Sequence, residues 1–194
     1  MPSGRGQGGD RRTGRRGFGR ARRPPDDPDS KEAARGRAIG LLSRRDLPAG
    51  ALRGRLADAG FASGAADEAV DELIDERLVN DARYVEAAVA SRTARGQGPV
   101  RIAMELKRLG VAADLVSGAV DARHPDWLER AADLRRRRFG AAPPTDARER
   151  ARQARFLLYR GFTGEHLRAA FGAAVPEEEF DLEALEGSDE PIAE

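Results

Sequence analysis

The apolar residues of this sequence follow one pattern three times. In each copy a leucine lies four residues before a glycine, and apolar residues lie directly after that glycine and ten residues after it. The copies cover residues 56–70, 106–120 and 157–171, and their glycines, Gly60, Gly110 and Gly161, are 50 and 51 residues apart. A repeat of this period indicates tandem copies of one supersecondary unit.

Around each glycine the apolar residues recur at helical spacing, and no stretch alternates with the period of two that a strand requires. Ile102, Leu106 and Leu109 form one such helical stripe. Pro48 and Pro99 are expected at first helical positions, because proline lacks only an N–H that is unpaired there. The three glycines are expected to be left-handed C-terminal caps, and each copy is then predicted to be three helices.

Side-chain oxygens are expected to cap the helix that follows each glycine, with Ser63 in the first copy and Thr163 in the third. In the second copy Asp114 or one of its neighbours is expected to take this role. The predicted class is all-α, with about nine helices.

The repeat divides the chain into five parts. We predict three-helix repeats over residues 31–80, 81–123 and 124–175, with a flexible loop at 139–146 inside the third. Units of this size bury little apolar surface alone, so they are expected to stack into an elongated molecule in which repeats contact only their neighbours. Residues 1–30 and 176–194 are expected to be disordered charged tails.

The net charge of +1 conceals a strong sorting of charge along the chain. Residues 1–30 carry +4, residues 31–175 carry +6 and residues 176–194 carry −9. From the first repeat to the third the net charge rises from −1 through +2 to +5. The basic repeats indicate an acidic partner such as nucleic acid, and the acidic C-terminal segment could compete with that partner for the same surface.

Several classes of protein are excluded or disfavoured. The chain has no cysteine, which excludes disulfides and cysteine-ligated zinc. His124 and His166 each lack a second histidine at helical spacing, so they are expected to be exposed or capping residues and not metal ligands. No nucleophile elbow or phosphate-binding loop occurs, and no apolar run of about 20 residues could span a bilayer. We therefore predict a cytoplasmic protein that is not an enzyme and holds no cofactor or metal.

The middle and last helices of each copy, joined through a glycine, have the outline of a helix-turn-helix. The second helix of such a motif must offer base-reading or phosphate-binding groups to the major groove. In the first copy this helix instead carries Asp67, Glu68, Asp71, Glu72, Asp75 and Glu76. Because these carboxylates repel phosphates, we interpret the glycines as caps of a structural repeat and the acidic helix as a solvated face or a site for a basic protein.

Basic side chains gather in the second and third repeats. Arg148, Arg152 and Arg155 are spaced by four and three residues, so they share one helical stripe, which Tyr159 continues. Arginines beside an aromatic ring suit a nucleic-acid backbone or an acidic protein groove, although a solvated helix face has the same pattern.

Other arginines differ in how free their charge is expected to be. Arg101 and Arg108 share a face with Glu105, so part of their charge is expected to be taken up in pairs within the helix. Arg92 and Arg95 have acidic neighbours only upstream and are expected to be freer. The run at 135–138 turns by 100° per residue, so its four arginines cannot all contact one surface; a helix C-terminus that favours cations explains it equally well.

Three segments of the chain resemble one protein family, in the same order and at matching spacing. The segments LVNDARYVEAAV at 78–89, SRTARGQGPVRIAMELKRLGV at 91–111 and ARFLLYRGF at 154–162 are similar to the motifs of RecX-family regulatory proteins. The resemblance covers roughly residues 33–172. Asn80 departs from it, because the family often has an acidic residue there.

The resemblance implies three tandem three-helix repeats in a curved, extended shape. It also implies a modulator, usually an inhibitor, of the RecA recombinase in DNA recombination and repair. Such a protein lies in the groove of the RecA–single-stranded DNA filament, where it blocks strand exchange and ATP hydrolysis or promotes loss of the filament. We expect a monomer that partners this filament. The alternative is a helical repeat module that binds nucleic acid without a recombinase partner.

The residues that we predict to bind DNA or the filament are Arg92, Arg95, Arg101, Arg108, Arg148, Arg152, Arg155, Tyr159 and Arg160.

Overall fold

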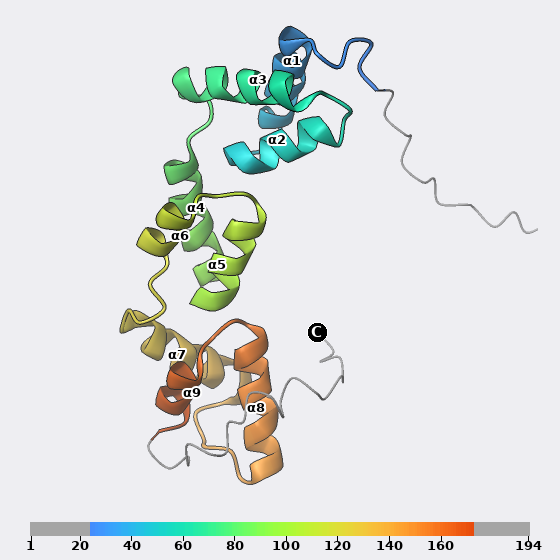
Figure 1. Cartoon of the computed structure of the whole chain (residues 1–194). Helices are drawn as coiled ribbons and strands as arrows, with labels where there is room; N and C mark the ends of the chain where they lie inside the picture. The colour runs from blue at the N-terminus through green and yellow to red at the C-terminus, as the bar shows by residue number, and fades with distance from the viewer. Residues whose placement is uncertain (1–23, 173–194) are drawn as a thin grey trace, which may run out of the picture.

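The computed structural model describes residues 24–172, which contain nine helices and no strand. The first repeat holds α1 (Lys31–Leu42), α2 (Ala49–Ala57) and α3 (Ser63–Asp75); the second holds α4 (Asp81–Ala94), α5 (Pro99–Arg108) and α6 (Ala113–Ala119); the third holds α7 (Asp126–Phe139), α8 (Ala147–Tyr159) and α9 (Gly164–Phe171). Figure 1 shows the three repeats stacked end to end in an elongated, gently curved molecule. The predicted all-α repeat architecture is confirmed.

The predicted glycine caps are confirmed in all three repeats. Gly60, Gly110 and Gly161 have φ angles of +96°, +77° and +90°, a region that only glycine adopts without strain. Each lies at the end of the middle helix of its repeat, where its N–H closes the last turn. The shared leucine-to-glycine spacing therefore records the same helix ending three times.

The N-terminal caps agree with the sequence only in part. Thr163 caps α9 by accepting from the His166 N–H, and Pro99 is the first residue of α5, both as predicted. Pro48 is instead the extended N-cap of α2, one position before the predicted place. Ser63 is the first residue of α3 after the N-cap Ala62, so its predicted capping role is wrong. The fixed φ of proline suits the N-cap as well as the first helical position, so the sequence alone does not show which of the two Pro48 occupies.

Asp114 does not cap α6 either. The N-cap of that helix is Ala112, which has no side-chain capping bond, and Asp114 lies inside the first turn. A carboxylate in the first turn stabilises a helix by its interaction with the helix dipole, without a capping hydrogen bond.

The buried side chains form two clusters, not three. Repeat 1 has its own core around Leu52, Leu56 and Leu73, each of which is fully buried. Repeats 2 and 3 share one continuous core that runs from α4 to α9. Trp127 at the start of α7 belongs to it: its ring packs edge-on against Phe162, and its Nε1 donates to the Asp121 carbonyl at 3.0 Å. The third repeat thus buries apolar surface against the second, which it needs because a unit of this size buries little apolar surface alone.

One type of joint connects each repeat to the next. The start of α2 packs against Gly110, which ends α5, and the start of α5 packs against Gly161, which ends α8. At the second joint, the Gly98 N–H donates to the Arg160 carbonyl at 2.7 Å and the Val100 N–H donates to the Gly161 carbonyl at 3.1 Å. At the first joint, a Cβ placed on Gly50 would lie 2.6 Å from the Cα of Gly110. Gly110 and Gly161 are therefore inter-repeat contacts as well as caps.

Residues 24–30, which the sequence assigns to the N-terminal tail, instead lie against repeat 1. Ser30 is the N-cap of α1, and the Pro28 carbonyl accepts from the Ala62 N–H at 2.9 Å. The prolines of this segment already restrict its backbone, so fixing it costs less entropy than a tail of ordinary residues. The predictions for residues 1–23 and 176–194 concern parts of the chain outside the described residues. None of the helices in residues 24–172 is long and apolar enough to cross a membrane.

Candidate nucleic-acid interface

Four arginines converge at the joint between repeats 2 and 3. Arg95, Arg137, Arg138 and Arg160 line a cavity of about 370 Å³ together with Leu134 and Phe156. A second cavity of about 180 Å³ adjoins it and again contains Arg95 and Arg137. Neither lining includes an aspartate or a glutamate. We call the four side chains the arginine cluster.

Helix ends bring the arginine cluster together. Arg95 and Arg160 are the C-caps of α4 and α8, and Arg137 and Arg138 lie in the last turn of α7. Cations are favoured at these positions because the carbonyl end of a helix carries partial negative charge. A spacing pattern within one helix does not reveal this grouping, because its members come from three different helices.

A buried aromatic ring supports the arginine cluster. The guanidinium carbons of Arg160 and Arg138 lie 5.2 and 6.0 Å from the centre of the Phe156 ring. Arg160 also donates to the Arg95 carbonyl at 3.4 Å, and Arg95 donates to the Ser91 Oγ at 2.8 Å. Guanidiniums held close together without a carboxylate in the lining repel one another. An anion between them relieves this repulsion, so the cluster is suited to phosphates.

The run at 135–138 splays as predicted. Arg135 is 6% exposed and donates to the Ala141 and Ala142 carbonyls at 3.3 and 3.2 Å, which holds the start of the loop after α7. Arg136 pairs with Asp133 on the same helix. Only the remaining two arginines, Arg137 and Arg138, reach the arginine cluster.

Two predicted binding residues, Arg92 and Arg101, form ion pairs within repeat 2. Arg92 donates to one carboxylate oxygen of Glu105 at 2.8 Å, and Arg101 donates to the other at 3.1 Å. Burial works against ionisation of Glu105, but the hydrogen bonds from both arginines outweigh it and hold the pKa of Glu105 below its ordinary value. Arg101 is paired as predicted. The prediction that Arg92 is freer is wrong, because Arg92 pairs with Glu105, which lies downstream on α5.

The predicted stripe on α8 is only partly available. Arg152 forms a two-pronged pair with Glu149 at 2.8 and 2.9 Å, and Arg155 is half-buried. Arg148 and Tyr159 are exposed, and Tyr159 keeps 69% of its surface accessible. Tyr159 directly precedes Arg160 in the sequence, but it does not line either cavity of the arginine cluster.

Arg101 and Arg108 lie at opposite ends of α5. The guanidinium carbon of Arg101 lies 5.3 Å from the centre of the Tyr159 ring, and Arg101 donates to the Tyr159 carbonyl at 3.1 Å. Arg108 is exposed and lies near the joint with repeat 1, two residues before Gly110. The nine predicted binding residues therefore do not form one surface.

The carboxylates of α3 are largely paired within repeat 1. Lys31 contacts Glu72 at 2.8 Å and Arg35 contacts Glu76 at 2.8 Å, both from α1. Arg53 of α2 contacts Asp67 at 3.0 Å and also Asp71. These pairs join α3 to its two neighbours, so the acidic helix has a structural role that the sequence pattern did not reveal.

The histidines have different environments. His166 is 1% exposed: its Nδ1 accepts from the Thr163 N–H at 3.0 Å, and its Nε2 lies 2.9 Å from the Ala122 carbonyl. The capping role is as predicted, but the side chain is buried. Burial lowers the pKa of His166, and this outweighs the opposing effect of the Ala122 carbonyl. His124 is exposed beside Asp126. Among residues 24–172, no three His, Asp or Glu side chains are grouped to hold a metal ion.

Comparison with known proteins identifies the family. Residues 80–120 match the second three-helix domain of RecX, and residues 125–171 match its third three-helix domain. The Regulatory protein RecX of Halorhodospira halophila is 43% identical over 150 residues, which is 77% of this chain and 93% of that protein. The chain belongs to the RecX family. Another RecX relative, from Acidithiobacillus ferrooxidans, is 42% identical over 136 residues, which is 70% of this chain and 87% of its own.

Solved RecX structures share the fold. The crystal structure of RecX from Lactobacillus salivarius superposes with a TM-score of 0.59 at 18% identity, over 72% of this chain and 93% of that one. A second crystal structure of a regulatory protein RecX gives a TM-score of 0.60 at 19% identity, over 72% and 70% of the two chains. The family predicted from the sequence motifs is confirmed by the two domain matches and the two relatives.

Proposed function

We propose that this protein binds the groove of the RecA–single-stranded DNA filament and inhibits the recombinase. It acts there on strand exchange and ATP hydrolysis, and so modulates recombination and DNA repair. It works as a cytoplasmic monomer without a catalytic centre. The relatives are named regulatory proteins, and RecA is the partner that membership of the RecX family implies.

The arginine cluster is the observation that carries the proposal. Its four arginines line cavities that contain no carboxylate, and Tyr159, the residue before Arg160, has an exposed ring. Arginine side chains neutralise phosphates, and an aromatic ring can stack on an unpaired base. An elongated stack of repeats suits a long groove, because successive repeats can contact successive parts of a filament. Among the predicted residues, we assign direct contacts to Arg95, Arg160 and Tyr159.

Exposed residues outside the cluster are assigned a secondary role. Arg108 and Arg148 are available for peripheral contacts with the filament. Arg92, Arg101, Arg152 and Arg155 act mainly by positioning helices, since their side chains are paired or half-buried.

The test is the ATPase activity of RecA on single-stranded DNA. The protein is expected to lower this activity at substoichiometric ratios to RecA. One elongated chain in the groove can cover several RecA subunits of the filament. The double variant Arg137→Gln/Arg138→Gln should inhibit less and bind filaments more weakly. Two lost phosphate contacts should also reduce the salt slope of DNA binding by about 1.4.

The matched control is Arg44→Gln/Arg45→Gln. This pair is also adjacent and exposed and also lies near the end of the first helix of a repeat, but it lies in repeat 1, far from the cluster. It should inhibit like the unaltered protein. Binding to naked DNA with no effect on the ATPase would instead support a nucleic-acid-binding module without a recombinase partner. Equal weakening by both double variants would show that overall charge, not the arginine cluster, governs binding.

A further inference from the structure

The first and third helices of repeat 2 are packed differently from those of the other repeats. In repeat 1 the facing alanines of these helices, Ala34, Ala38 and Ala69, are completely buried. In repeat 3 Ala131 of α7 and Ala170 of α9 are also buried. In repeat 2, by contrast, α6 has only seven residues, and small side chains of α4 and α6 stay exposed. In repeat 2 these helices still meet through Val85, Ala88 and Val116, but they cover less of each other than in repeats 1 and 3.

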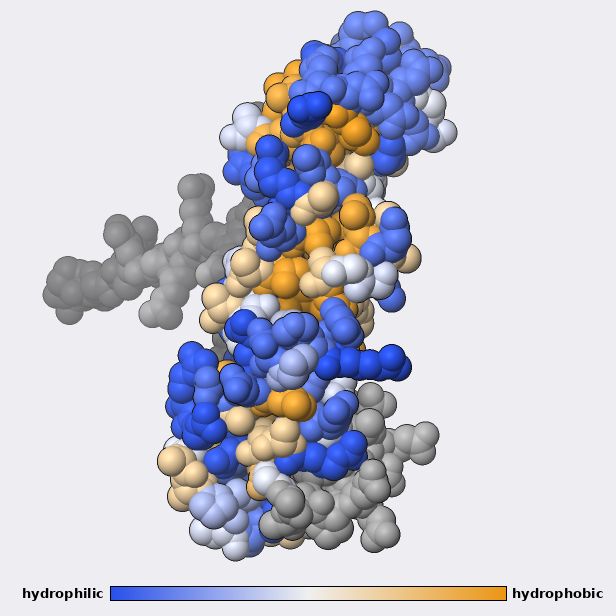
Figure 2. Space-filling model, turned by 90° about the vertical axis from the view of Figure 1, so that its left-hand side faces the viewer, coloured by the Kyte–Doolittle hydropathy of each residue, from blue (hydrophilic) through white to orange (hydrophobic). Residues whose placement is uncertain are grey.

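The opening is a groove of about 860 Å³ between α4, α6 and the start of α7. We call it the α4–α6 groove. Its α4 wall is a stripe at helical spacing, formed by Ala82, Val85, Glu86, Val89, Ala90, Thr93 and Ala94. Leu115, Gly118 and Ala119 of α6 line the opposite wall. Figure 2 views the side on which α4 and α6 lie in Figure 1, and it shows apolar residues gathered across the middle of the molecule.

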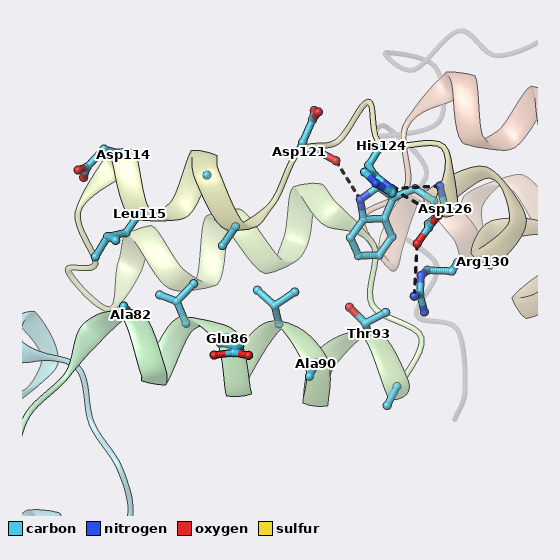
Figure 3. Close-up of a pocket in the computed structure, with 16 residues that line it drawn as sticks. Ala82, Glu86, Ala90, Thr93, Asp114, Leu115, Asp121, His124, Asp126 and Arg130 are labelled. Carbon is cyan, nitrogen blue, oxygen red and sulfur yellow. Dashed lines mark hydrogen bonds and ion pairs between the residues drawn. The ribbon is translucent and has the colours of Figure 1, made fainter.

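The charged groups around the α4–α6 groove are mainly carboxylates. Glu86 and Asp114 are exposed, and no ion pair within residues 24–172 engages their side chains. Figure 3 shows Asp114 at the end of the groove far from His124 and Arg130. At that other end Asp126 lies 3.5 Å from His124 and 4.0 Å from Arg130, and Asp121 accepts from the Arg123 N–H at 2.9 Å, so both of these acids have partners.

We propose that the α4–α6 groove binds an amphipathic helix of a protein partner. The apolar face of that helix packs against Val89 and Leu115, and its lysines or arginines lie beside Glu86 and Asp114. The stripe from Ala82 to Ala94 is about 18 Å long at 1.5 Å per residue, which matches about three turns of a bound helix. A helix laid in an apolar groove buries side chains at positions i, i+3, i+4 and i+7.

Charge and size select this occupant. The unpaired carboxylates repel an acidic segment such as residues 176–194, which carry −9. The basic N-terminal residues 1–23 contain Phe18 as their one aromatic residue and are otherwise rich in glycine, so they offer too little apolar surface for the groove. A basic helix with its own apolar stripe satisfies both walls. The groove contains none of the four arginines of the cluster, although it shares Thr93, Ala94 and Arg130 with the smaller cavity beside them. The proposal does not rest on the proposed function.

The probe is a synthetic helix of about four turns, with leucines at i, i+3, i+4 and i+7 and lysines elsewhere. Its fluorescence anisotropy is followed during titration with the full chain, without nucleic acid or recombinase. The lysine peptide should bind, and a peptide with glutamates in place of the lysines should not. Glu86→Gln/Asp114→Asn should weaken binding several-fold at low salt and less at high salt.

Bulk is tested separately from charge. Ala90→Trp fills the α4–α6 groove and should weaken binding about tenfold, which corresponds to about 1.4 kcal/mol. Ala87→Trp is the matched control, because Ala87 is exposed on the same helix but does not line the groove. Ala119→Trp repeats the test from the α6 wall and should act like Ala90→Trp. Circular dichroism of all three variants should be that of the unaltered chain.

Three results would overturn the proposal. The first is equal binding of the lysine and glutamate peptides, or binding of neither. The second is unchanged affinity in both groove-filling tryptophan variants. The third is a chain that dimerises in sedimentation experiments and becomes monomeric on Ala90→Trp, since the occupant would then be a second copy of this chain.

Discussion

The joint between repeats 1 and 2 can be tested with a single methyl group. Gly50 lies in the first turn of α2 with ordinary helical geometry, so Gly50→Ala adds no backbone strain. Its new Cβ, however, would lie 2.6 Å from both the Cα and the carbonyl oxygen of Gly110, where ordinary contacts are 3.4–4 Å. Backbone cannot rotate away as a side chain does, so the two repeats must separate by nearly 1 Å.

The expected cost follows from what that separation breaks. The Ala49 N–H donates to the Asp81 carboxylate across the joint at 2.8 Å, and a bond of this charged type contributes about 1.5–3 kcal/mol. Overpacking adds about 1–3 kcal/mol, and the better helix propensity of alanine offsets about 0.5–1 kcal/mol. We expect Gly50→Ala to lower the free energy of unfolding by about 2–4 kcal/mol, or the Tm by about 5–10 °C.

Gly54→Ala is the control, because Gly54 lies on the same helix with no atom within 4 Å of its added Cβ. It should leave the Tm unchanged or raise it slightly. The chain has no cysteine, so spin labels can be attached at Glu68→Cys and Lys107→Cys on either side of the joint. The distance between the labels should lengthen or broaden with Gly50→Ala only. The same Tm and the same label distance in both variants would refute the joint.

Four further predictions concern the site, the core and the tail. Tyr159→Ala should weaken binding to single-stranded DNA by about 1–3 kcal/mol while Tyr159→Phe keeps the affinity, measured by anisotropy; a loss in both would assign the effect to the hydroxyl group. Because the folded-state pKa of His166 lies below the ordinary 6.5, the unfolded chain binds the proton first, so the free energy of unfolding should fall as the pH drops through 6.5. His166→Asn should flatten that step in denaturant titrations, and an unchanged step would place it elsewhere. Glu105→Ala leaves Arg92 without its carboxylate and should cost about 1–3 kcal/mol in urea unfolding, whereas a neutral effect would mean that the pair is replaced by water. Removing residues 176–194 should tighten DNA binding, most clearly at low salt, and equal affinity would show that this segment does not compete.

The fold was largely predictable because its determinants are local. A left-handed glycine and apolar residues at helical spacing act within a few residues of one another, and both recur near Gly60, Gly110 and Gly161. The joints were not predictable in this way. Gly50 and Gly110 contact each other from different repeats, and nothing in the local pattern of either glycine indicates its partner.

The candidate site was harder to predict for the same reason. The sequence indicates that Arg92 has close acidic neighbours only upstream, but it does not show that Glu105 of α5 pairs with it. It shows that the run at 135–138 splays, but not that two of its members meet Arg95 and Arg160. Pairing between helices decides which arginine remains available, and this depends on tertiary contacts that spacing alone does not contain.

Electron microscopy of RecA filaments on single-stranded DNA, with and without this protein, tests the central proposal most directly. We expect additional elongated density in the helical groove, with the joint between repeats 2 and 3 facing the DNA. The Arg137→Gln/Arg138→Gln variant should reduce this density, and the Arg44→Gln/Arg45→Gln variant should retain it. Filaments without additional density at saturating protein would contradict the proposed function. Density in which only repeat 1 contacts the filament would contradict it as well.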